Sequence, residues 1–354
     1  MTQTINPDVV HFNARLRAVK SDFFTRHDIE EMLNKGDVAN MAEALLDSNY
    51  RKEMAEALTR YNGADAIEEA LTRNLAKTYQ MLIHRAVGDF KILVELFLTR
   101  WDLAAVKSLI RCVHHSFEPE DAVSSLVPGP ELTVPLLQEF AAAENVEILI
   151  RQLVAWRPDL CSGLLAAYPA YEKSNDPAPL EEVLDRDYFV GNVRVLSDMQ
   201  DPDAIRLKEY LQSEIDRINL RVVFQYVERL LQSVNLSERL FPEGTLKVEF
   251  LMRMAERDSV EGAMEMLGKT SYRDLVDELY ELVQTHRFAP VERFIERIMI
   301  RQIRREARSN AFGIAVMMDY VWLKYNEVVN LRLVARGLTG HIPPGRVRSE
   351  LYFI

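Results

Sequence analysis

Apolar residues along this chain recur at the three- and four-residue spacing of helices, not in the alternation typical of strands. Five of them between Val38 and Leu46 share one face, which predicts a helix over that segment. Upstream, the pattern predicts a helix from Asn13 and a short second helix that Asp28 opens and Gly36 stops. Strand-like segments of β-branched residues are scarce, so the pattern predicts an almost all-α chain.

A short motif recurs at a nearly constant interval along the chain. It consists of an acidic residue, a small or amide residue three positions later, then an aliphatic residue and a base. The copies are Asp102-x-x-Ala105-Val106-Lys107, Asp216-x-x-Asn219-Leu220-Arg221 and Glu327-x-x-Asn330-Leu331-Arg332. The acidic residues are 114 and 111 residues apart. A fixed period of this kind indicates an architecture built from copies of one unit.

Three further sets of landmarks keep the same order along the chain. The first set is the valines at which a helix is expected to begin, Val38, Val146 and Val260. The second is the segments 67–71, 180–184 and 291–295. The third, present only in the last two copies, is Leu132 and Leu246. Together they predict three similar helical subdomains at 10–117, 118–233 and 234–354. The Pro- and Gly-containing linkers would lie at His115–Pro130 and Asn235–Gly244.

The predicted units exceed the roughly 20–50 residues of familiar solenoid repeats. We therefore expect small helical subdomains, which can meet around a pseudo-threefold axis, and not the turns of one rod. A length of 354 residues with 48% hydrophobic residues is enough to bury a core.

The net charge narrows the class of partner, and the cysteine content indicates the compartment. The formal net charge of −11 argues against general nucleic-acid binding, which needs a basic face. Cys112 and Cys161 are too few for a disulfide scaffold, so a reducing compartment is expected. The pattern predicts neither a signal peptide nor a spanning helix, and contact with a membrane would then come through a partner.

No arrangement of residues predicts catalysis, a cofactor or a metal site. The segment from Gly262 to Gly268 resembles a phosphate-binding loop but has five residues between its glycines where four are needed, and we assign it to a helix over 260–267 that ends at Gly268. His114 and His115 have acidic neighbours but lack the spacing of metal ligands. We therefore expect a protein that is not an enzyme.

The acidic and amide residues of the repeated motif share one helix face, because they are three positions apart. Two interpretations remain open: the pair satisfies backbone groups at a junction between helices or between helix and loop, or it presents a polar surface to a partner. The partner-binding candidates among these residues and their neighbouring bases are Asp216, Asn219, Arg221, Glu327, Asn330 and Arg332.

The most basic predicted helix spans residues 293–308. Four arginines share one of its faces at helical spacing, and an apolar set lies opposite. The arginines are Arg297, Arg301, Arg304 and Arg308, and the apolar residues are Phe294, Ile295, Ile298 and Met299. The face is either solvated or docks an acidic partner surface, for which clustered arginines would set orientation and association rate.

These motifs together resemble the C subunits of the A-type and bacterial V/A-type rotary ATPases, which are the counterparts of the d subunits in eukaryotic V-ATPases. The resemblance is carried by Arg100–Arg111, by Glu214–Leu220, by Gly244-Thr245-Leu246 and by Glu327 through Pro343, although Ala105 stands where the family usually has Asn. It implies a funnel of three all-helical subdomains and a non-catalytic function. Such subunits sit, one per complex, on the cytoplasmic side of the membrane rotor ring and receive the foot of the central shaft.

The rotor subunit would transmit torque in a complex that moves protons or sodium ions. The alternative, from another functional class, is a helical-repeat scaffold for soluble protein partners. Neither interpretation requires a cofactor.

Overall fold

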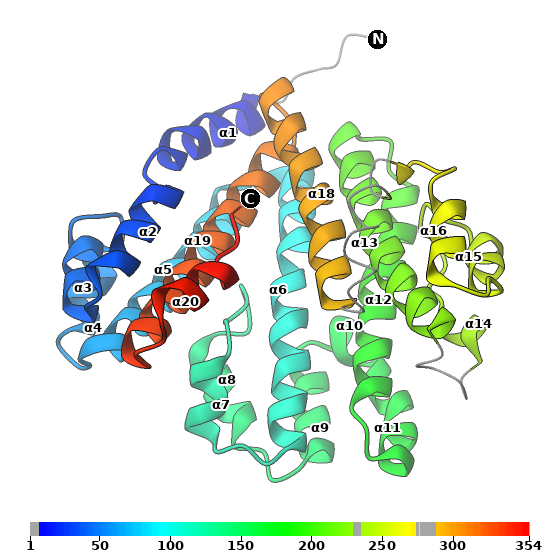
Figure 1. The fold of residues 1–354 in the computed structure, drawn as a ribbon, viewed down its shortest axis with the longest axis horizontal. Coiled ribbons are helices and arrows are strands. Elements are labelled where there is room, and N and C mark those ends of the chain that lie inside the picture. Colours follow the sequence, from blue (N-terminus) through cyan, green and yellow to red (C-terminus); the bar gives the residue numbers. More distant parts are fainter. Residues whose placement is uncertain (1–6, 229–234, 274–275, 277–287, 354) are drawn as a thin grey trace. The chain divides into compact units, whose positions relative to one another are not determined.

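The computed structural model describes residues 7–228, 235–273, 276 and 288–353. Within these ranges every regular element is a helix (Figure 1), which confirms the prediction of an all-α chain. The chain divides into two compact units, residues 1–181 with 306–354, and residues 182–305. The predicted division into three subdomains at 10–117, 118–233 and 234–354 stays a prediction.

The first unit contains the N-terminal helices and the end of the chain. Its helices are α1 (Pro7–Lys20), α2 (Arg26–Lys35), α3 (Val38–Leu46), α4 (Arg51–Ala57), α5 (Gly63–Arg85), α6 (Gly88–His114), α7 (Pro119–Ser125), α8 (Val134–Ala141), α9 (Val146–Trp156), α10 (Pro158–Cys161), α11 (Gly163–Ser174), α19 (Ala315–Thr339) and α20 (Pro344–Glu350). The second unit contains most of α12 (Ala178–Ser197), then α13 (Pro202–Val227), α14 (Leu236–Arg239), α15 (Val248–Ala255), α16 (Val260–Leu267) and most of α18 (Phe288–Ser309).

The start of α2 differs from the prediction. The helix begins at Arg26, because Thr25 is its N-cap and forms a capping box with Asp28. The Asp28 carboxylate accepts the Thr25 N–H at 2.7 Å, so Asp28 is the third residue of the helix and does not open it. Gly36 ends the helix in the left-handed region, at a φ of 72°, as its sequence position predicted.

The three Val landmarks each mark the first residue of a helix, namely α3, α9 and α16. A polar residue directly before the Val caps each helix by accepting a backbone N–H in the first turn. The caps are Asp37, Asn145 and Ser259. The glycine-flanked segment that resembles a phosphate loop lies on α16, which ends before Gly268 and confirms the helical interpretation.

Helix α19 lies at the centre of the first unit, where it packs against α1, α2, α3 and α5. Its buried residues point in all directions around its axis, and the ring of Trp322 meets that of Trp101 from α6 at 5.6 Å between centroids. The core therefore joins helices near both ends of the chain.

Candidate functional site

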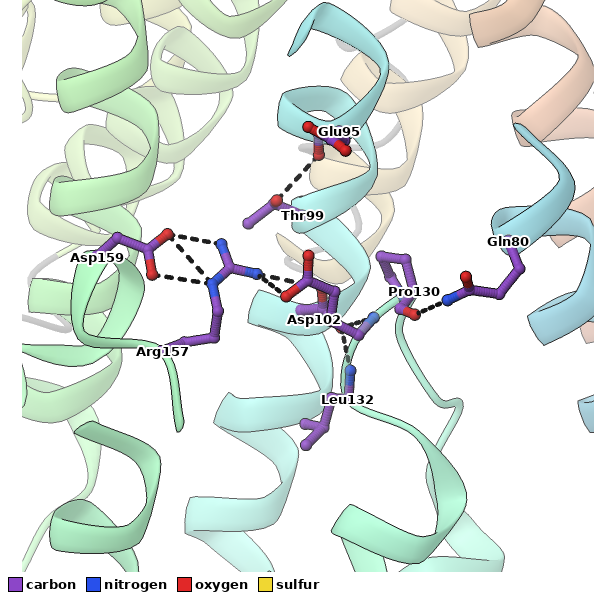
Figure 2. Close-up of polar contacts among 9 residues, drawn as sticks. Gln80, Glu95, Thr99, Asp102, Pro130, Leu132, Arg157 and Asp159 are labelled. Carbon is purple, nitrogen blue, oxygen red and sulfur yellow. Dashed lines mark hydrogen bonds and ion pairs between the residues drawn. The ribbon is translucent and has the colours of Figure 1, made fainter. Parts of the chain in front are cut away.

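The first copy of the repeated motif lies on α6 and holds the linker to α8. Asp102 is fully buried, and its Oδ1 accepts the backbone N–H groups of Glu131 at 3.0 Å and Leu132 at 2.8 Å (Figure 2). Its Oδ2 lies 3.9 Å from Nη1 of Arg157, which also pairs with Asp159. Burial raises the pKa of Asp102 to about 7, against the opposing effect of the two N–H groups and the guanidinium.

The second copy repeats this geometry on α13. Asp216 is buried, and it accepts the backbone N–H groups of Thr245 at 3.1 Å and Leu246 at 3.0 Å. The two donors follow the acid by 29 and 30 residues, as they do at Asp102. The hydroxyls of Thr245 and Tyr272 also donate to this carboxylate. Burial raises the pKa of Asp216 while these hydrogen bonds oppose the shift.

The third copy, on α19, uses a donor from the other end of the chain. Glu327 Oε1 accepts the backbone N–H of Phe24 at 2.7 Å, and its Oε2 accepts the Tyr50 hydroxyl at 2.5 Å. The ammonium of Lys324 donates to the same Oε2 at 2.9 Å. Lys324 and Glu327 are only 3% and 4% exposed, and burial lowers the pKa of Lys324 against the attraction of Glu327.

One rule relates the three carboxylates. Each accepts the N–H of the residue directly before the N-cap of a helix: Leu132 before α8, Leu246 before α15 and Phe24 before α2. We call these contacts the first, second and third junctions. Each carboxylate thus fixes the residue before which a helix starts, and at the first and second junctions it also satisfies a buried backbone donor.

The motif's asparagines form a second repeated contact. The Asn219 amide donates to the Phe241 carbonyl at 2.8 Å and accepts the Phe241 N–H at 2.7 Å. Asn330 makes the same pair with Tyr352, at 2.6 and 3.1 Å, and both partners lie 22 residues after the asparagine. We call these pairs amide clamps, because each holds both backbone groups of one residue. Ala105, at the corresponding position of the first copy, has no amide to do so.

The bases of the motif have different environments. Arg332 is only 6% exposed, and its Nε lies 3.0 Å from Oε2 of Glu68 on α5. Its guanidinium also donates to the Thr72 hydroxyl. Arg221 and Lys107 are half-buried on α13 and α6. The third base therefore ties α19 to α5 inside the first unit.

Nearly the whole sequence matches one family of known proteins. The family model described as the ATP synthase (C/AC39) subunit matches residues 12–350. The chain belongs to this family. The resemblance found in the sequence motifs is therefore confirmed.

Several archaeal relatives of this family member are named as C subunits of A-type ATP synthases. The protein of Methanothermobacter thermautotrophicus is 28% identical over 74% of this chain and 68% of its own length. That of Methanosarcina acetivorans is 26% identical over 96% and 91%, and that of Haloquadratum walsbyi is 25% identical over 98% of both chains. The motifs of this family member thus lie within a match that spans nearly its full length.

Five of the candidate residues are buried in this family member and bonded within its own chain. They are Asp216, Asn219, Glu327, Asn330 and Arg332. Such a placement is the one expected if the polar residues satisfy groups at junctions within the chain. A role of these residues and of Arg221 in partner binding stays a prediction.

The arginine face lies on α18. Arg301 is exposed, whereas Arg297 and Arg304 are half-buried, and the apolar side is formed by buried Ile295 and Met299 with half-buried Ile298; the side chain of Phe294 is outside the part described. Arg308 is exposed near the end of the helix, where it lines a cavity of about 240 Å³ together with residues of α1 and α19. The predicted two-sided helix is thus observed where its side chains are described.

His114 makes a polar contact with the Tyr171 hydroxyl, at 3.0 Å from Nδ1. In the part of the chain that the structure describes, no three His, Cys, Asp or Glu side chains are arranged to hold a metal ion. Across the same residues, no helix combines the length and apolarity needed to cross a bilayer.

Sequence reasoning missed the donors at the third junction. Leu132 and Leu246 stood out as landmarks, and each lies 30 residues after its acid. Phe24 and Tyr50 precede Glu327 by 303 and 277 residues, so no local spacing could reveal them. At both amide clamps the partner lies 22 residues after the asparagine. The sequence did not reveal this spacing, because the asparagine binds backbone groups, which every type of residue carries.

Proposed function

We propose that this chain is the non-catalytic central-rotor subunit of a V/A-type rotary ATPase that moves protons or sodium ions. In this role it couples the central shaft to the membrane rotor ring and transmits torque between them. The observation that carries the proposal is the family match, which extends from the first repeated unit to the last. It acts on the cytoplasmic side, with one copy per complex, and meets the membrane only through the ring.

The first and second junctions suit a part that carries torque. A coupling subunit must keep its helices from shifting under load, and a buried carboxylate that accepts two backbone N–H groups fixes a linker more firmly than apolar packing alone. The amide clamps of Asn219 and Asn330 add two directional hydrogen bonds each. The six polar candidates of the motif would then support partner binding indirectly, by holding the linkers in place.

The direct contact with the shaft is assigned to the arginine face of α18. Arg301 is exposed, and with Arg297, Arg304 and, further along, Arg308 it provides positive charge in a chain of net charge −11. Such a patch attracts an acidic helical surface and orients it, while the overall charge disfavours nucleic acid. The proposed partner surface is therefore an acidic face at the foot of the shaft.

Affinity purification from native membranes, with and without detergent, tests the proposal. We expect the tagged chain to bring down shaft subunits in both cases and ring subunits when the detergent preserves the complex. A tagged unrelated helical protein of similar net charge serves as the control. If only soluble proteins outside the rotary complex copurify, the helical-repeat scaffold becomes the better account.

A further inference from the structure

We propose that α1 and α2, residues 7–35, form a strap that closes the third junction and opens as a unit while the remainder of the first unit stays folded. This inference goes beyond the proposed function and does not depend on it. It is a conformational property of the isolated chain.

The third junction differs from the other two in how its donor is tethered. At the first and second junctions the donor follows the acid by 30 residues along one continuous stretch of chain. At the third, Phe24 comes 303 residues before Glu327. The linker of the other junctions is thus replaced by a segment that reaches its site through folding alone. Such a contact can be lost and regained without moving a short stretch of chain that joins the acid to its donor, as the linkers of the other two junctions do.

The strap is held to the end of the chain by separate polar contacts. On α1, Arg17 donates to the Ala307 carbonyl at 2.6 Å, and the Asn13 amide donates to the Gly313 carbonyl at 3.0 Å. Lys20 pairs with Asp319 of α19. Beyond the junction, the guanidinium of Arg26 lies over the Phe353 ring at 5.3 Å. These contacts are spread along the strap, from Asn13 on α1 to Arg26 on α2.

A cavity lies beneath the strap. It has a volume of about 240 Å³, and its walls come from α1 on one side and from the end of α18 and the start of α19 on the other. Leu16 and Arg17 face Val316 and Tyr320 across it. Atoms that line a cavity lack part of their dispersion contacts, so this cavity weakens the packing of α1 against the rest of the first unit.

The buried charges at the third junction favour opening of the strap and do not favour unfolding of the rest of the first unit. Lys324 and Glu327 are both buried in the closed state, and the attraction of Glu327 offsets only part of the cost of desolvating Lys324. Opening of the strap removes the Phe24 N–H from Glu327 and the Phe23 ring from Lys324. The helices on which they rest keep their own support, since α19 also packs against α5.

Hydrogen–deuterium exchange of the full chain tests the strap. In the wild type we expect peptides from 7–35 to exchange faster than those from 88–114 under conditions in which both units stay folded. Glu327→Ala should speed exchange in 7–35 by about tenfold or more and leave 126–141 unchanged. The matched variant Asp102→Ala should do the reverse, because it loosens the first junction and not the third.

If Glu327→Ala fails to fold, Glu327→Gln and Asn13→Ala carry the test. The first keeps the acceptor and the shape of the side chain, and the second removes a strap contact without touching the buried charges. Both should speed exchange in 7–35 selectively. The proposal is overturned if 7–35 and 88–114 exchange at one common rate in the wild type, or if these variants speed exchange equally throughout the first unit.

Discussion

Gly129 lies directly against Asp102. A Cβ placed on Gly129 would overlap the Asp102 carboxylate and lie 2.7 Å from the Asp102 Cα. The backbone of the linker therefore reaches the carboxylate only because no side chain stands between them. The second junction repeats the arrangement, since a Cβ on Gly244 would overlap Oδ1 of Asp216.

Substitution of these glycines should destabilise the protein. We expect Gly129→Ala and Gly244→Ala each to lower the free energy of unfolding by roughly 2–4 kcal/mol, because the added methyl group displaces the linker and leaves a buried carboxylate without its donors. Urea denaturation followed by circular dichroism measures the change. Gly191→Ala, in α12 with no atom within 4 Å of the added Cβ, is the control and should be neutral or slightly stabilising. Equal stability of all three variants would contradict the close approach.

Asp102 should make stability depend on pH. Burial raises its pKa to about 7 from an ordinary value of 3.8, so between these values the folded chain binds more protons than the unfolded chain. Stability contributed by Asp102 should therefore fall as pH rises from about 4 to about 7, by up to about 1.4 kcal/mol per unit, and be constant above that range.

The variant Asp102→Asn isolates this effect, because its amide oxygen still accepts hydrogen bonds but does not titrate. The difference in unfolding free energy between wild type and variant, measured in urea at pH 5, 6, 7 and 8, should shift in favour of the variant as pH rises and then level off. A difference that stays constant over this range would show that Asp102 is ionised throughout.

The amide clamp at Asn330 should hold the end of the described chain. We expect Asn330→Ala to release Tyr352, because both of its backbone groups lose their partner, at a cost of roughly 1–3 kcal/mol. Hydrogen–deuterium exchange should show faster exchange in 345–353 and no change at 238–246. Asn219→Ala is the matched variant and should give the opposite pattern through Phe241. A global rise in exchange from either variant would argue against local clamps.

Reversal of charge at Arg301 should weaken docking of the proposed shaft partner. Arg301 is exposed on α18, so Arg301→Glu should lower affinity for an acidic shaft surface by about tenfold and change the melting temperature little. Binding to purified shaft subunits by calorimetry at two salt concentrations measures the effect. Arg151→Glu, a charge reversal at another exposed arginine, on α9, is the control. If both variants bind like the wild type, the arginine face is a solvated surface.

Much of the fold could be predicted because its signals are local. The helix that starts at Val38 and its apolar face were predicted, because the apolar spacing acts within a few residues, whereas its end at Leu46 lies a few residues before the expected end near Asn49 and Tyr50. The boundary at α2 was missed because Asp28 and Thr25 both suit an N-cap, and only the geometry of the capping box distinguishes them. The burial of Lys324 was also missed, because nothing in its immediate sequence indicates a partner such as Tyr50.

The sequence by itself determined the helical class, the order of the repeated landmarks and the positions of the acids and amides, because these depend on spacings within one helix or one linker. Only the tertiary structure decided what each polar group binds. Asp102 and Asp216 accept donors at a constant 30 residues, yet the donors are backbone N–H groups that carry no side-chain signature. Glu327 accepts Phe24 across 303 residues, because the packing of α19 against α2 brings the two together.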